Sequence, residues 1–305
     1  MVNPLAPTYG IWLVSLWIAT MLYGVGVLQT WLYFHWYSND HWGVKLTVVF
    51  LLLSETLQIS CLFGETYVAF VNNFGDKNAI FFVSWLDTTQ LLVGFLSAFI
   101  VQMYFAWCIF LLNRKQKIVT LLIVVLALTQ IGAGLAQAIK AAIIGSLLQI
   151  DAIKTVIICQ SAATLACDTV ITLALYLALR SKRSEMKRTN TLLQKLMLNG
   201  INRGALTTIA AAVNIILFLA LPGTLYFILC LLTSSKLYMN SMLATLNTRQ
   251  HMIQSASHSA SIEPWSSIHL PRLSAVPNLT NTPTFTALHS DDISTRKTNL
   301  VENMI

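Results

Sequence analysis

The sequence contains little charge for its length. Only 10% of its 305 residues are Asp, Glu, Lys or Arg, whereas 56% are hydrophobic. Soluble domains carry about 25% charged residues, so this chain has too few charges to cover a water-facing surface. The composition excludes a soluble enzyme and a nucleic-acid-binding domain, and it indicates a polytopic membrane protein.

Proline and cysteine are also scarce where they would alter the fold. Pro222 is the only proline between Pro7 and Pro264, which leaves the intervening helices free of the kinks that proline introduces. The five cysteines all lie within apolar segments. A framework of disulfide bonds is therefore not expected.

Long apolar segments occupy most of the chain. A helix needs about 20 mostly apolar residues to cross a bilayer. Seven segments qualify: residues 9–34, 44–70, 85–112, 118–141, 156–179, 201–221 and 224–246. The last two are separated by Pro222 and Gly223, which are typical of a tight turn. We therefore predict an all-α membrane protein, with a seven-transmembrane-helix bundle over residues 1–248.

The distribution of positive charge predicts the orientation of this bundle. With the N-terminus outside, 15 of the 19 Lys and Arg residues fall on the cytoplasmic side, as the positive-inside rule requires. The first apolar segment is too long for the core of a signal peptide and is expected to remain as a span. The C-terminus is then cytoplasmic, and the plasma membrane is the expected location.

Two polar segments lie outside the predicted spans. Residues 181–199 are basic, and they form either a docking site for a cytoplasmic signalling partner or an extension of the sixth span. Residues 249–305 contain four prolines and 15 Ser or Thr residues. This composition predicts a disordered cytoplasmic tail, which is a second candidate site for a signalling partner.

Ionisable residues within the spans are the first candidates for function, because charge is costly in lipid. Glu55, Asp168 and Lys236 share one layer, about 15–18 Å from the cytoplasmic ends of their helices. Lys236 is expected to pair with Asp168 or Glu55. A second layer, near the outer face, contains Glu65, Asp87 and Lys140.

These charged layers have two interpretations. They line a ligand pocket or an ion path, or they pair with one another and lock the helices together. Glutamines are also distributed over five spans and are expected to bridge helices by hydrogen bonds. They are Gln29, Gln58, Gln90, Gln102, Gln130, Gln137 and Gln160.

Motifs of enzymes are missing from the sequence. It has no Gly-x-Ser-x-Gly, no His-Glu-x-x-His and no phosphate-binding glycine loop. The segment that begins at Trp85 looks like the counter-ion region of microbial rhodopsins, but Leu232 stands where that family has an aspartate before its lysine. We predict no catalytic residue, no metal and no cofactor.

The C-terminal spans resemble a known family. The strings that carry the resemblance are Thr191-Leu-Leu-Gln-Lys-Leu, Asn202-Arg-Gly-Ala-Leu-Thr and Ser235-Lys-Leu-Tyr-Met-Asn, which continues to Arg249. They are similar to basidiomycete fungal membrane proteins whose C-terminal half is a domain of unknown function, here about residues 164–249. The resemblance covers about residues 8–250. It implies a seven-helix topology and a fungal membrane, and it brings no activity.

The family strings also place polar residues on the last two helices. Lys236, Asn240 and Asn247 lie on one face of the seventh helix, and Tyr238 lies on another. Asn202 and Arg203 lie at the cytoplasmic mouth of the sixth, where Arg203 is a candidate hydrogen-bond partner of Asn247. This arrangement predicts a polar seam between helices six and seven.

Two functions remain open at this point. A receptor-like protein is favoured by the number of spans, the outward N-terminus, the basic loop and the Ser/Thr-rich tail. The alternative is a transporter or channel that uses Glu55, Asp168 and Lys236. The odd number of spans and the absence of a visible inverted repeat weigh against transport. The expected surroundings are the lipid bilayer, with no nucleic acid.

Overall fold

The structure is a computed structural model that describes residues 6–38, 40–76, 78–112, 117–183, 191–221 and 224–261. Within these ranges, the side chains of residues 181–200, 202–203 and 249–261 are among those that are not described. The chain divides into two compact units, Met1–Ser255 and Ala256–Ile305. The fold and the site below belong to the first unit.

Seven α-helices account for most of the described residues. They are α1 (Ile11–Trp36), α2 (Trp42–Tyr67), α3 (Trp85–Leu112), α4 (Lys117–Ile144), α5 (Lys154–Arg183), α6 (Thr191–Ala220) and α7 (Tyr226–Ser261). Short π- or 3₁₀-helical turns stand before α1 (Ala6–Gly10), after α2 (Val68–Asn72), before α3 (Ala79–Phe81) and before α5 (Leu147–Ile153). The described residues contain no β-strand. The prediction of an all-α fold is confirmed.

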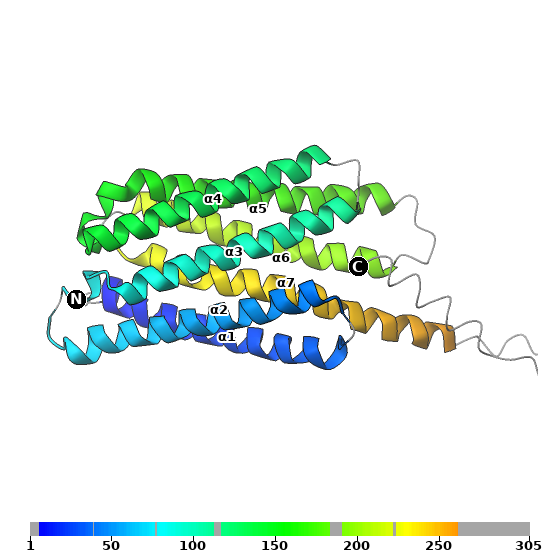
Figure 1. Cartoon of the computed structure of the whole chain (residues 1–305), viewed down its shortest axis with the longest axis horizontal. Coiled ribbons are helices and arrows are strands. Elements are labelled where there is room, and N and C mark those ends of the chain that lie inside the picture. Colours follow the sequence, from blue (N-terminus) through cyan, green and yellow to red (C-terminus); the bar gives the residue numbers. More distant parts are fainter. Residues whose placement is uncertain are drawn as a thin grey trace, which may run out of the picture. The chain divides into compact units, whose positions relative to one another are not determined.

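Successive helices run up and down and pack side by side (Figure 1). Each helix from α1 to α5 contacts the next one along the chain. The C-terminal ends of α1, α3 and α5 lie at one end of the bundle, and those of α2, α4 and α6 lie at the other. Short connections between antiparallel neighbours are the usual topology of a helical bundle.

Helix α7 is the most enclosed of the seven. Every residue from Tyr238 to Asn247 is buried, and α7 runs between α2 and α6 in Figure 1. Tyr238, Met239, Met242, Leu243 and Leu246 belong to the largest apolar cluster of the protein. A helix that is buried all round is expected to contact several neighbours, and α7 does so through both its apolar and its polar side chains.

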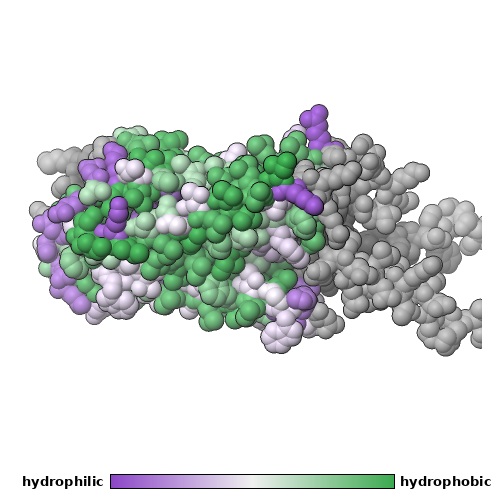
Figure 2. Space-filling view, turned by 45° about the horizontal axis from the view of Figure 1, so that its top comes forward, coloured by the Kyte–Doolittle hydropathy of each residue, from purple (hydrophilic) through white to green (hydrophobic). Residues whose placement is uncertain are grey.

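The outer surface of the bundle is apolar. On α1, Trp17 and Trp31 are each 61% exposed, and Leu28 is 56% exposed. Figure 2 shows apolar residues over the middle of the visible face and hydrophilic residues toward its ends. A surface on which so many large apolar side chains are exposed is typical of a protein that lies in a membrane.

Among the described residues, six helices are long and apolar enough to cross a membrane. Within α6 the apolar part is shorter, Gly204–Ala220. Six to seven helices therefore have the character of membrane spans, and the chain fits a multi-pass membrane protein.

The helix boundaries agree with the predicted spans except at the last two helices. The third span was predicted at 85–112, which is where α3 begins and ends. Helix α6 begins at Thr191 rather than at residue 201, so the segment after Thr191 continues helix α6 beyond its apolar part, Gly204–Ala220. Helix α7 continues to Ser261, past residue 249, where the tail was predicted to begin. Residues 262–305 lie outside the described residues.

At one end of the bundle, two of the connections between helices are hydrogen-bonded to each other. Gly145 ends α4 with a positive φ of 68°, a conformation that glycine adopts without strain. The backbone N–H of Val83 donates to the Gly145 carbonyl at 3.0 Å. The connection from α2 to α3 is thereby tied to the connection from α4 to α5.

Candidate functional site

Glu55 of α2 and Lys236 of α7 form a buried ion pair. Lys236 Nζ lies 3.3 Å from Glu55 Oε2, and the two side chains are 1% and 0% exposed. The sequence left Asp168 and Glu55 as alternative partners of Lys236, and the structure selects Glu55. A pair without contact to solvent requires further polar partners to offset its desolvation.

Gln58 and Ser235 supply those partners. Lys236 Nζ donates a hydrogen bond to Gln58 Oε1. The Ser235 hydroxyl lies 2.6 Å from Gln58 Oε1 and 3.1 Å from Glu55 Oε2, and its one proton serves one of them. Gln58 Nε2 donates to the backbone carbonyl of Gln90 on α3 at 2.9 Å. The cluster thus holds α2, α3 and α7 together.

Asp168 of α5 has a different set of partners. Its Oδ2 accepts a hydrogen bond from the Tyr238 hydroxyl of α7 at 2.6 Å, and its Oδ1 accepts one from Gln102 Nε2 of α3 at 3.1 Å. The carboxyl is 3% exposed. Lys236 and Tyr238 are two residues apart, which is about 3 Å along a helix and more than half a turn around it. Asp168 and Glu55 therefore lie near one layer but on opposite faces of α7.

Glu65 and Asp87 meet at one serine. The Ser84 hydroxyl donates to Glu65 Oε2 at 2.5 Å and lies 3.4 Å from Asp87 Oδ2. The Ser84 N–H donates to Asp87 Oδ2 at 3.1 Å, and the Leu86 N–H donates to Ser84 Oγ at 3.0 Å. This is the reciprocal arrangement of a capping box, so Asp87 has a structural role at the start of α3. Lys140, which was expected in this layer, is exposed on α4.

The polar stripe of α7 faces α1 and α2. Asn240 Nδ2 donates to the Leu22 carbonyl at 2.9 Å, and Asn247 Nδ2 donates to the Gln29 carbonyl at 2.7 Å. Both carbonyls belong to α1. The sequence predicted a seam with the sixth helix, and these two hydrogen bonds instead join α7 to α1. The side chains of Asn202 and Arg203 lie outside those that the structure describes.

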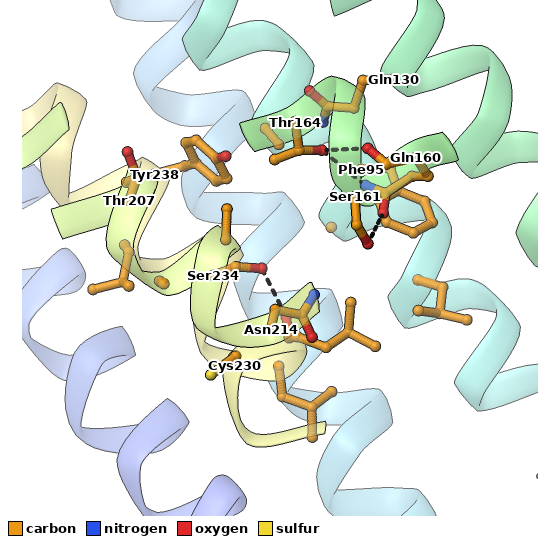
Figure 3. A pocket seen from close by; sticks show the side chains of 18 of the residues that line it. Phe95, Gln130, Gln160, Ser161, Thr164, Thr207, Asn214, Cys230, Ser234 and Tyr238 are labelled. Atoms are coloured by element: carbon orange, nitrogen blue, oxygen red, sulfur yellow. Dashed lines mark hydrogen bonds between the residues drawn. The ribbon is translucent and has the colours of Figure 1, made fainter. Parts of the chain in front are cut away.

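A pocket lies among α3, α4, α5, α6 and α7 (Figure 3), and Gln58 of α2 also belongs to its lining. It is a partly open pocket, with about 700 Å³ of empty space when its open side is counted and about 50 Å³ available to the centres of water-sized molecules. Its described lining contains amides, hydroxyls and apolar groups but no Asp, Glu, Lys or Arg. The polar lining residues are Gln58, Gln90, Gln130, Gln160, Ser161, Thr164, Thr207, Asn214, Ser234 and Tyr238.

The glutamines within the helices differ in their hydrogen-bond partners. Gln58 and Gln102 bridge helices as predicted. Gln90 instead donates to Asp87 of its own helix at 2.9 Å, and Gln160 donates to Thr164 one turn later at 3.1 Å. Gln130 of α4 is 0% exposed, and its two polar side-chain atoms have no hydrogen-bond partner in the described part of the chain. For Gln130 the prediction of a bridge between helices is wrong.

The pocket was not predicted as a site from the sequence. Gln130 and Gln160 were noted only as bridges, and Ser161, Thr164, Thr207 and Asn214 were not singled out. The signal was present in the glutamines, because five spans each carry at least one. Sequence alone does not show which of them face the same space.

Comparison with known families gives one match. Residues 164–251 match a family of unknown function (DUF6534), which agrees with the resemblance predicted over about residues 164–249. The matched range includes Asp168, Lys236, Asn240 and Asn247. Neither the curated proteins nor the solved structures give a match to this chain. The class that emerges is a helical, multi-pass membrane protein with a domain of unknown function.

Proposed function

We propose that this protein is a receptor-like, signal-sensing membrane protein with seven spans. It binds a small molecule in the pocket among α3–α7 and signals at its cytoplasmic end. One observation carries this proposal: Tyr238 lines the pocket and also donates a hydrogen bond to Asp168. A ligand in the pocket contacts a residue that links α7 to α5.

A second, smaller cavity extends this link. Asp168, Gly204, Thr207 and Tyr238 line it, so Thr207 and Tyr238 form part of the wall of both cavities. Helices α5 and α6 approach closely at Gly204. A Cβ added there would lie only 2.5 Å from Thr172 Oγ1. Displacement of Tyr238 would shift the packing of α5 against α6. The basic segment 181–199 covers the end of α5, the connection between the two helices and the start of α6. We propose this segment, together with the tail, as the docking site of a cytoplasmic partner.

The buried charges fit this proposal as structural groups. Glu55 and Lys236 neutralise one another, and neither lines the pocket in the described part of the chain. The proposal assigns no catalytic activity to the protein. It retains the outward N-terminus, the cytoplasmic C-terminus and a fungal plasma membrane, which are supported by the distribution of positive charge and by the sequence resemblance.

The alternative function is a transporter or channel that uses Glu55, Asp168 and Lys236. A line of polar groups favours it. Gln58 connects the Glu55–Lys236 pair to the backbone of Gln90, whose side chain donates to Asp87. Ser84 then joins Asp87 to Glu65. This line runs from the interior of the bundle to the first turn of α3.

Recovery of the protein with its partners tests the proposed function. The tagged full chain is isolated from its own membranes in mild detergent, and co-purifying proteins are identified by mass spectrometry. We expect a signalling protein, such as a heterotrimeric G protein, that is lost when Lys182, Arg183, Lys187 and Arg188 are replaced by Ser. The control replaces Arg114, Lys115 and Lys117 by Ser, because these basic residues lie between the third and fourth predicted spans and outside the proposed docking site. It should recover the partner as the wild type does. A preparation without such a partner would contradict the receptor-like function.

A further inference from the structure

The pocket contains a buried amide without a partner. Gln130 is 0% exposed, and both its Nε2 and its Oε1 lack a hydrogen-bond partner in the part of the chain that the structure describes. Figure 3 shows its side chain at the pocket wall beside Thr164, with no bond drawn to it. Buried amides are nearly always hydrogen-bonded, because an unsatisfied one loses its bonds to water without replacement. Gln130 therefore presents a donor and an acceptor to whatever occupies the pocket.

Two further helices present acceptors to the same space. Gln90 Oε1 of α3 and Asn214 Oδ1 of α6 are buried and have no hydrogen-bond partner among the described residues, and both residues line the pocket. With Gln130 Oε1, three buried carbonyl oxygens lack a partner among the described residues, and so does Gln130 Nε2, which carries two N–H groups. A complementary ligand therefore donates at least one hydrogen bond to these oxygens. Hydroxyl groups and amide N–H groups satisfy this requirement.

The lining also determines the charge and polarity of the ligand. The described lining holds no charged side chain, so a carboxylate, phosphate or ammonium group would be buried without a counter-charge. The wall also contains apolar side chains, among them Leu91, Phe95, Leu232 and Leu237. Apolar side chains combined with polar groups in fixed positions are usual in a small-molecule site.

From these groups we infer that the pocket binds a small, uncharged molecule with an apolar body and at least one hydroxyl or amide N–H. Gln130 is its principal hydrogen-bonding residue, and Gln90 and Asn214 accept from its donors. This inference rests on the proposed function, because it takes the pocket as the place where the signal molecule binds. It adds the chemical class of that molecule.

Photolabelling with an alcohol tests the inference. The full chain is reconstituted in lipid nanodiscs and irradiated with 3-azioctanol, and the labelled residues are located by mass spectrometry. We expect labels on the pocket-lining segments of α3–α7 that octan-1-ol competes away and that octanoate and octylammonium do not. Labels confined to the lipid-facing residues, or equal competition by the charged compounds, would overturn the inference.

Variants of the buried glutamines make the test specific. Gln130→Leu keeps the size of the side chain and removes both polar atoms, so we expect pocket labelling to fall about tenfold, as for the loss of one hydrogen bond. Gln137→Leu is the matched control, because Gln137 is also buried on α4 but does not line the pocket. Unchanged labelling of a folded Gln130→Leu variant would contradict the assignment.

A second variant covers the case in which Gln130→Leu does not fold. Ala211→Leu fills the pocket from α6 and leaves the glutamines in place, so it should also abolish labelling. Binding and signalling are measured separately. Pocket labelling without a cytoplasmic partner would uphold the ligand class and refute the receptor-like function, and a partner without pocket labelling would do the reverse.

Discussion

The Tyr238 hydroxyl donates a 2.6 Å hydrogen bond to Asp168 Oδ2, which joins the most enclosed helix of the bundle to α5. Both side chains are buried, at 5% and 3% exposure. The carboxyl therefore depends on Tyr238 and Gln102 to replace water. This contact combines a structural role with the proposed transmission of a signal.

Tyr238→Phe should destabilise the protein without altering its packing. The ring is retained, but Asp168 loses a buried donor, which costs about 1 to 3 kcal/mol. We expect a lower midpoint of thermal unfolding in detergent. Tyr176→Phe on α5 is the control, because Tyr176 is 48% exposed and its replacement should leave the midpoint unchanged. Equal midpoints for the two variants would show that the Asp168 contact contributes nothing to stability.

The Glu55–Lys236 pair should behave as a unit. Lys236→Met leaves Glu55 buried and unpaired, which costs about 3 to 5 kcal/mol. The double variant with Glu55→Gln removes both charges at little change in volume and should recover most of that stability. Thermal unfolding of the single and double variants measures the coupling. A folded double variant that loses an ion flux present in the wild type would favour the transporter instead.

Gly134 should be intolerant of a larger side chain. A Cβ at this position would lie 2.7 Å from Cδ2 of Phe95 on α3, and such overpacking costs about 1 to 3 kcal/mol. Gly134→Ala should therefore lower the unfolding midpoint. Gly132→Ala on the same helix meets nothing within 4 Å and should leave stability unchanged or slightly raise it. The opposite order of the two midpoints would contradict the close packing of α3 on α4.

Ser84→Ala should weaken the start of α3. It removes the N-terminal cap and the hydroxyl shared by Glu65 and Asp87, at a cost of about 0.5 to 2 kcal/mol. Hydrogen exchange of the first turn of α3, measured by mass spectrometry, should become faster. The control is Ser60→Ala, whose hydroxyl bonds only within α2, to the Thr56 carbonyl. If both variants exchange alike, the capping box is not a determinant of this helix end.

The sequence predicts the spans well because their signal is local. Apolar runs of sufficient length and the lack of proline set α1–α5 within a few residues. The two last helices deviate because α6 and α7 extend beyond their apolar parts, to Thr191 and Ser261. The Ser84-x-x-Asp87 spacing is a capping signal that was available in the sequence and was read as an outer charged layer.

The site is less predictable than the fold. Depth along a helix placed Glu55, Asp168 and Lys236 in one layer, but depth does not give the direction in which a side chain points. Lys236 therefore had two candidate partners, and only the packing of α7 against α2 selects Glu55. In the same way, the sequence identifies Gln130 as a polar residue in a span, but it cannot show that its amide has no partner among the described residues of the neighbouring helices.

The most direct test of the receptor-like account is to measure how much cytoplasmic partner co-purifies with each tyrosine variant. We predict that Tyr176→Phe recovers as much partner as the wild type. Tyr238→Phe should change the amount at least about fivefold, the lower end of typical coupling between sites. Equal recovery with Tyr238→Phe, at an equal amount of folded protein, would contradict transmission through the Tyr238–Asp168 contact.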